Sequence, residues 1–199
     1  MEDTYKTIEA PSEGIFKDKG SKFYAFAWPV TCEEEIKEII TALKKEHHSA
    51  RHHCYAWRLG TGEIRFRAND DGEPSSTAGR PILGQLQSLD VTNTLVVVVR
   101  YFGGTLLGTS GLINAYKTAA AEALKNANIV TKIIEQQFSI NFEYSKLSEV
   151  MEVVKQKNLN FVKTNFDENC SVLLSIRNSE VQKITAIFSK IYGVKIESA

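Results

Sequence analysis

The chain has little cysteine and little proline, and its cysteines are not arranged in pairs. Of 199 residues only three are cysteine and four are proline. The cysteines, Cys32, Cys54 and Cys170, are far apart and form no Cys-x-x-Cys motif. This excludes a disulfide scaffold and is typical of free thiols in a reducing compartment. We therefore predict a cytoplasmic protein.

Long hydrophobic runs and net charge are also absent. The longest strongly apolar run, Leu95–Val99, is far shorter than the roughly 20 residues of a transmembrane helix. The first residues lack the basic and apolar segments of a signal peptide. The 24 basic residues balance the 24 acidic ones. Neutrality argues against a protein that coats nucleic acid by bulk electrostatic attraction, although a local basic site remains compatible with it.

What is present is the composition of an ordinary globular protein, with 43% hydrophobic and 24% charged residues. The hydrophobic periodicity predicts a mixed α+β fold. In the first part of the chain the predicted helices are 33–47, 77–88 and 111–127, and the predicted strands are 23–28, 53–59, 63–68 and 95–99.

The pattern restarts after residue 128. Alternation predicts strands at 138–142, 159–166, 170–176 and 194–196, with helices carrying Leu147 to Val154 and Val181 to Ile191. Strand-helix-strand-strand-helix-strand is the ferredoxin-like βαββαβ order. We therefore divide the chain into two domains, 1–130 and 131–199.

A glycine-rich stretch, 101–110, joins the predicted strand 95–99 to the helix 111–127 and contains Gly103, Gly104 and Gly108. A loop of this kind that opens a helix can aim backbone N–H groups and the helix dipole at a phosphate. The spacing matches neither a Walker A loop nor Gly-x-Gly-x-x-Gly. The alternative is a tight packing turn, which spacing alone favours.

An acidic loop, 69–81, holds three carboxylates within four residues, Asp70, Asp71 and Glu73. Such a group can bind a hard cation through oxygen ligands or supply a general acid or base. The alternative is a solvated turn followed by a helix cap, and composition favours it.

All four histidines lie within 47–53. His48 and His52 have the spacing of two zinc ligands on one helical face, but we expect the helix to end near 48, which removes that geometry. In a strand, His52 and Cys54 share one face, and His53 and Tyr55 share the other. We predict no metal site, and we expect one histidine at a strand start to contribute to a polar site.

Basic and aromatic residues alternate in 55–58 and 65–67. Such alternation can bind single-stranded nucleic acid by stacking and phosphate pairing. It is also the ordinary pattern of a half-buried strand, so it does not separate the two readings.

Three motifs together resemble those of the IMPACT family. They are Ala50–Trp57, then Asp70–Pro74 with Thr77–Pro81, and then Val99–Gly104 with Leu107–Gly108 and Gly111–Leu112. Their order and spacing cover most of residues 15–127. The segment 131–199 is similar to the small C-terminal domain of bacterial members.

The resemblance implies a first domain like domain two of ribosomal protein S-five and a ferredoxin-like second domain similar to domain five of elongation factor G. Eukaryotic relatives are linked to translational control. We therefore expect a non-enzymatic regulator of translation that binds the ribosome, RNA or a translation-related protein, with no membrane partner and no cofactor. One alternative is an enzyme for a small anionic or phosphorylated substrate, and another is a pure protein-interaction module.

The expected binding residues are those of the three motifs: His52, Asp71, Glu73, Arg80, Arg100, Tyr101, Gly103, Gly104 and Gly108. The enzyme alternative requires His52, Asp71, Glu73 and Arg100 to meet in one cleft.

The chain departs from the family pattern at four positions. The pattern has Lys at Leu106, Arg at Asn114, and Gly at Ser110 and at Ser76. Two cations are thus missing beside the glycine-rich loop, which weakens phosphate binding there. Binding to nucleic acid would have to rely on a local site.

Overall fold

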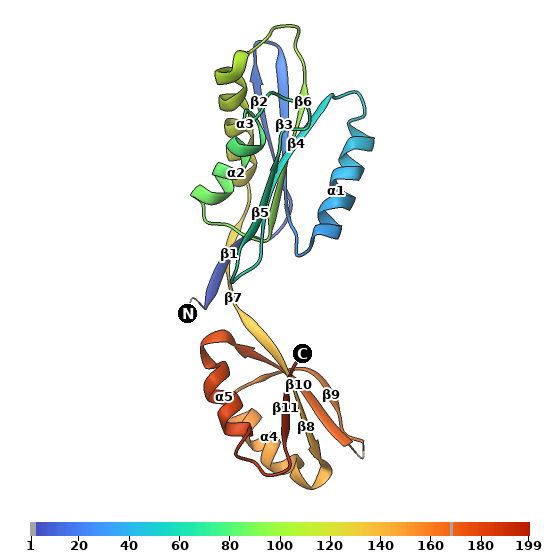
Figure 1. The fold of residues 1–199 in the computed structure, drawn as a ribbon, viewed down its shortest axis with the longest axis vertical. Helices are drawn as coiled ribbons and strands as arrows, with labels where there is room; N and C mark the ends of the chain where they lie inside the picture. Colours follow the sequence, from blue (N-terminus) through green and yellow to red (C-terminus); the bar gives the residue numbers. More distant parts are fainter. Residues whose placement is uncertain (1–2, 168) are drawn as a thin grey trace. The chain divides into compact units, whose positions relative to one another are not determined.

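The computed structural model describes residues 3–167 and 169–199, which form two compact units (Figure 1). The N-terminal unit is Tyr5–Lys132, and the C-terminal unit is Ile133–Ala199 together with the start of the chain up to Thr4. Both units combine helices and sheets, so the predicted α+β class is confirmed.

The predicted first domain, 1–130, includes Asp3 and Thr4. In the structure both residues belong to the C-terminal unit. The Asp3 carbonyl accepts a hydrogen bond from the N–H of Ile134 at 2.8 Å. Its carboxylate accepts hydrogen bonds from the N–H and the hydroxyl of Ser179 at 2.7 and 2.8 Å. These contacts are more than 130 residues apart in sequence, so local patterns did not reveal them.

A five-stranded antiparallel sheet forms the centre of the N-terminal unit, in the order β2-β3-β6-β4-β5. Its strands are β2 (Ser12–Asp18), β3 (Ser21–Pro29), β4 (His52–Leu59), β5 (Arg65–Asn69) and β6 (Thr94–Tyr101). β6 is buried at every residue up to Arg100, because helices cover both faces of the sheet. The register places His52 of β4 opposite Arg100 of β6.

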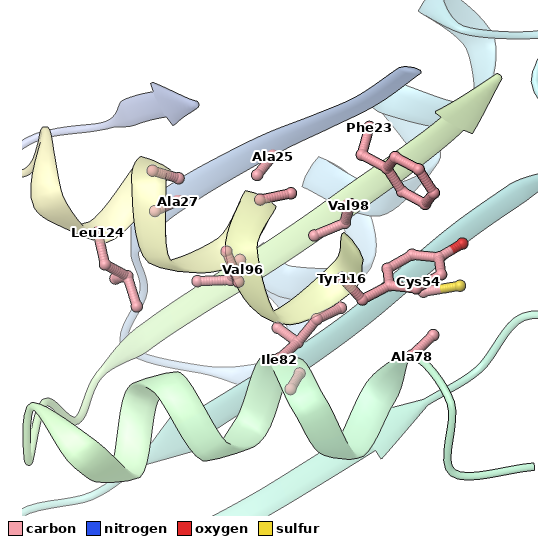
Figure 2. Packing of buried hydrophobic residues seen from close by; sticks show 14 of the residues in the cluster. Phe23, Ala25, Ala27, Cys54, Ala78, Ile82, Val96, Val98, Tyr116 and Leu124 are labelled. Carbon is pink, nitrogen blue, oxygen red and sulfur yellow. The ribbon is translucent and has the colours of Figure 1, made fainter. Parts of the chain in front are cut away.

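Helices α2 (Gly79–Ser88) and α3 (Gly108–Lys125) cover one face of this sheet, and α1 (Glu33–Glu46) covers the other (Figure 1). Figure 2 shows the core under α2 and α3, where Tyr116 and Ile82 of the helices meet Phe23 and Val98 of the sheet. α3 approaches β2 so closely that a side chain at Gly14 would collide with the helix backbone at Ala123.

Helix α3 begins three residues before the predicted start at 111, and α2 begins at Gly79 instead of 77. The sequence Gly108-Thr109-Ser110-Gly111 has low helix propensity, so propensity alone placed it in the loop. Beyond α3, Ile129–Ile133 forms a strand, β7, that pairs with β1 (Thr4–Ile8) in a two-stranded sheet. This pairing was not predicted.

The C-terminal unit has the predicted element order. Its elements are β8 (Glu135–Glu143), α4 (Leu147–Gln156), β9 (Asn160–Asn165), β10 (Asn169–Arg177), α5 (Val181–Phe188) and β11 (Lys195–Ser198), with short 3₁₀ turns at Tyr144–Lys146 and Asn178–Glu180. The antiparallel sheet has the order β11-β8-β10-β9. Its core lies between the sheet and the two helices, around Ile140, Val172, Ile184 and Phe188.

No helix in the described part of the chain is long and apolar enough to span a membrane.

Candidate functional site

The histidine motif opens strand β4, and its side chains alternate between the two faces as predicted. His52 donates from Nδ1 to the carbonyl of Asp71 at 2.9 Å, and the Cys54 thiol donates to the carbonyl of Asp70 at 3.0 Å. His53 lies on the α1 side and is 4% exposed. Burial lowers the pKa of His53, and the nearby Asp71 carboxylate opposes this.

The zinc spacing of His48 and His52 does not fall on one helix, because α1 ends at Glu46. Within residues 3–167 and 169–199, no group of three or more His, Cys, Asp or Glu side chains could hold a metal ion.

Asp70 holds the acidic loop and the start of α2 together. Its carboxylate accepts hydrogen bonds from the N–H groups of Ser76, Ala78 and Gly79 at 2.8, 3.0 and 2.8 Å. Burial by itself raises the pKa of Asp70, but the three donors outweigh burial, and the pKa lies below its ordinary value. Asp70 is therefore a structural residue of the turn.

Asp71 directs its carboxylate away from His52. One oxygen accepts a hydrogen bond from the N–H of His53 at 2.7 Å, and the other accepts one from Lys44 of α1 at 3.0 Å. Only the Asp71 carbonyl contacts His52. The four residues of the enzyme alternative therefore do not all turn their side chains into one cleft.

Glu73 and Arg100 form a buried ion pair. Glu73 Oε1 accepts hydrogen bonds from Arg100 Nη1 and from the Tyr116 hydroxyl, both at 2.7 Å. The Arg100 guanidinium lies 5.6 Å from the ring centres of both Phe23 and Phe102. Burial raises the pKa of Tyr116, which keeps its hydroxyl protonated as a donor. Because removing one partner strands a buried charge, the pair depends on both residues.

An open cleft of about 810 Å³ lies over this ion pair. Its lining residues are Ser49, Arg51, His52, Glu73, Pro74, Arg100, Tyr101, Phe102, Leu106, Leu107, Gly108, Thr109 and Leu112. Of the nine expected binding residues, the cleft gathers His52, Glu73, Arg100, Tyr101 and Gly108.

Four expected residues do not line the cleft. Asp71 faces α1 instead, and Arg80 is exposed beside Asp70. Gly103 packs against the turn at Gly20, where a side chain would collide with backbone atoms. Gly104 has a left-handed φ of +88° in open space. Gly103 thus belongs to a tight packing turn, the alternative that spacing favoured, and of the three glycines expected to bind only Gly108 lines the cleft.

Sequence reasoning missed several residues that line the cleft or contact a residue that lines it. Arg51 and Phe102 lie inside two of the motifs, but nothing in the spacing marked their side chains as exposed cleft groups. Tyr116 meets Glu73 across 43 residues of sequence, a contact that only the fold creates.

Arg51 and Phe102 give the cleft an unpaired positive charge and an exposed aromatic surface. Arg51 is exposed and makes no ion pair or hydrogen bond with any described residue. The Phe102 ring is 56% exposed and the Leu106 side chain 83%. A cleft lined by a free guanidinium and an exposed ring can hold an anionic group together with a flat or apolar one.

Comparison with known proteins identifies a family model and relatives that this chain resembles. Residues 19–124 match the family model described as the Impact N-terminal domain. A Haemophilus influenzae protein described as an IMPACT family member is 32% identical over 170 residues, which cover 84% of this chain and 82% of that protein.

Two solved structures are also similar. A crystal structure of a hypothetical protein superposes with a TM-score of 0.73 at 27% identity and covers 100% of this chain and 98% of its own. The structure of Yih1, described as a two-domain translational regulator, has 30% identity and a TM-score of 0.37, with 61% of this chain and 47% of that one covered.

Proposed function

This chain belongs to the IMPACT family, and we propose that it regulates translation without catalysis, by binding single-stranded RNA in the cleft of its N-terminal unit. The observation that carries the proposal is that one cleft is lined both by Arg51, which has no partner among the described residues, and by the exposed Phe102. Single-strand binding proteins combine a cation for the backbone with a ring on which a base stacks. Translational control is what the resemblance of the motifs implies for the family.

The charge distribution supports a local mode of binding. The whole chain is neutral, with 24 basic and 24 acidic residues. Binding that depends on many phosphate contacts needs a continuous basic surface. A cleft lined by one free arginine and an exposed aromatic ring can instead hold a single nucleotide.

The carboxylates favour binding over catalysis. Glu73 is held by Arg100 and Tyr116, and Asp71 is held by Lys44 and the His53 N–H. Asp70 already accepts three backbone donors. A general base must be able to reach and accept a substrate proton, and the Asp70 and Asp71 carboxylates do not line the cleft, so neither can reach a substrate bound there.

We also propose the finer fold assignments that the resemblance implies: a ribosomal-protein-S-five-like N-terminal domain and a ferredoxin-like C-terminal domain. The second is supported by the strand order β11-β8-β10-β9 and by the βαββαβ element order. The cytoplasm is the proposed location, and the free thiols of Cys32, Cys54 and Cys170 support it.

Fluorescence anisotropy with a short, labelled single-stranded RNA tests the function. We expect salt-dependent binding, which Phe102→Ala and Arg51→Ala each weaken by roughly tenfold. Phe66→Ala is the matched control, because Phe66 is 60% exposed on β5 and does not line the cleft. An equal loss in Phe66→Ala and Phe102→Ala, or no binding at low salt, would contradict the proposal.

A further inference from the structure

Helix α3 begins at the cleft. Its first two residues, Gly108 and Thr109, line the cleft, and the N-cap residue Leu107 makes no side-chain capping bond. The first N–H groups of a helix have no partner within the helix, and they carry the positive end of its dipole. The first turn of this 18-residue helix contains no acidic residue. An anion at this point of the cleft would therefore be stabilised.

Arg100 provides a second, independent indication in the same cleft. Its side chain is only 7% exposed, and its Nε has no hydrogen-bond partner within the described residues. Glu73 engages only Nη1. A buried guanidinium normally uses all its donors, because each unpaired one costs free energy. Beyond Nη1, the donors of Arg100 have no partner among the described residues, and Arg100 lines the same cleft as Gly108 and Thr109.

The excess charge in the cleft is positive. The Glu73 carboxylate is offset by Arg100 at 2.7 Å, so this pair contributes little net charge. Arg51 has no acidic partner in the described chain, and Asp71 is paired with Lys44 on the α1 side. The uncompensated charges are the guanidinium of Arg51 and the partial charge of the helix end.

We propose that these groups form a subsite for a phosphate monoester, so that the preferred ligand is the terminal phosphate of an RNA strand. The inference rests on the proposed function and specifies which part of the RNA the cleft takes. A phosphate within a strand is a diester with one charge, whereas a terminal monoester carries close to two at neutral pH and exposes three oxygens. A site whose positive charge is concentrated at one point gains more from the monoester than a long basic groove would.

The apolar lining fits the nucleotide attached to such a phosphate. Leu106 and Phe102 are exposed at the cleft, and Leu112 and Leu107 are buried in its wall. A base or ribose that packs on these side chains leaves its phosphate free to reach Arg51 and the helix end.

Binding of three RNAs of identical sequence tests the subsite: one with a 5′-phosphate, one with a 3′-phosphate and one with hydroxyls at both ends. We expect at least one phosphorylated RNA to bind about tenfold more tightly than the hydroxyl RNA. Equal affinities for all three would overturn the subsite and leave the proposed RNA binding intact.

Thr109→Asp isolates the contribution of the helix end. An acidic residue in the first turn stabilises a helix, so the variant should fold, but its charge repels a phosphate. We expect Thr109→Asp to abolish the preference for the phosphorylated RNA. Thr118→Asp is the matched control, because this half-buried threonine of the same helix does not line the cleft. Loss of the preference in both variants, or in neither, would overturn the assignment.

Competition by adenosine monophosphate and by adenosine separates the two proposals. Displacement of the RNA by the monophosphate but not by the nucleoside supports the subsite. Binding of the monophosphate by a protein that binds no RNA would support the subsite and overturn the proposed RNA function.

Discussion

The two units differ in what they bury. In the described part of the chain, every buried polar or charged side chain lies in the N-terminal unit, and these include His53, Glu73 and Arg100. The C-terminal unit buries only apolar side chains and Cys170. Burying a charge costs free energy that only good partners offset. A core that retains such groups therefore marks the unit in which we look for a site.

The largest expected effect comes from removing one partner of the buried Glu73–Arg100 ion pair. Glu73→Ala leaves Arg100 charged and without its partner, so we expect the N-terminal unit to lose about 3–5 kcal/mol of stability. Chemical denaturation followed by near-ultraviolet circular dichroism measures this loss. The double variant Glu73→Ala/Arg100→Ala should lose less than the sum of the two single variants. Strictly additive losses would show that the two charges are not coupled.

A matched deletion in the other unit sharpens the comparison. Ile140 is fully buried in the C-terminal core, and Ile140→Ala should cost about 2–4 kcal/mol by loss of apolar contacts. Because this core holds no charged group, the loss should be the same at pH 5 and pH 8. A loss that depends on pH would contradict the purely apolar description of this core.

Acidification from pH 7 to pH 5 should destabilise the N-terminal unit much more than the C-terminal unit. Burial lowers the pKa of His53 below its ordinary value of 6.5, Lys44 and His47 lower it further, and Asp71 opposes them. The unfolded chain then takes up a proton first, so stability falls as the pH drops below 6.5, by up to about 1.4 kcal/mol per pH unit. Thermal melting between pH 5 and pH 7 measures this fall.

His53→Gln is the control for this prediction, and it should flatten the pH profile. The C-terminal unit provides an internal reference, since all four histidines lie within 47–53. An unchanged profile in His53→Gln would assign the pH dependence to another group.

The smallest expected effect concerns backbone conformation. Ser76 has a φ of +65°, a left-handed value that favours glycine, and the resemblance to the IMPACT family implies glycine at this position. We expect Ser76→Gly to stabilise the N-terminal unit by about 0.5–1 kcal/mol, measured as a higher melting temperature. In the C-terminal unit, Asn158 has a φ of +50°, but asparagine tolerates this region. Asn158→Gly should therefore give a smaller gain, and an equal or larger gain would contradict this account.

More of the fold than of the candidate site could be predicted from the sequence. The unbroken apolar run Leu95–Val99 predicted a strand buried on both faces, and β6 is that strand. Alternation likewise assigned His52 and His53 to opposite faces of β4. These predictions depend only on the period of a strand, which the sequence contains.

The remaining features depend on contacts between distant residues. The Tyr116 hydroxyl can donate to Glu73 of the buried ion pair only because α3 packs over β6, and no local sequence pattern predicts that contact. Asp71 is acidic like Glu73 and lies two positions before it in the sequence, yet its carboxylate contacts Lys44 on the other face of the sheet. The acidic loop could be identified from the sequence, but which of its carboxylates faces the cleft could not be predicted.

The hydrogen bonds of Asp3 to Ile134 and Ser179 have a consequence for synthesis of the chain. Asp3 is translated before the N-terminal unit, and its partners are translated after it. The N-terminal unit can therefore fold on the ribosome while Asp3 still lacks those partners. The Asp3–Ser179 contact of the C-terminal unit therefore forms late, and it closes a loop of 176 residues that contains the whole N-terminal unit.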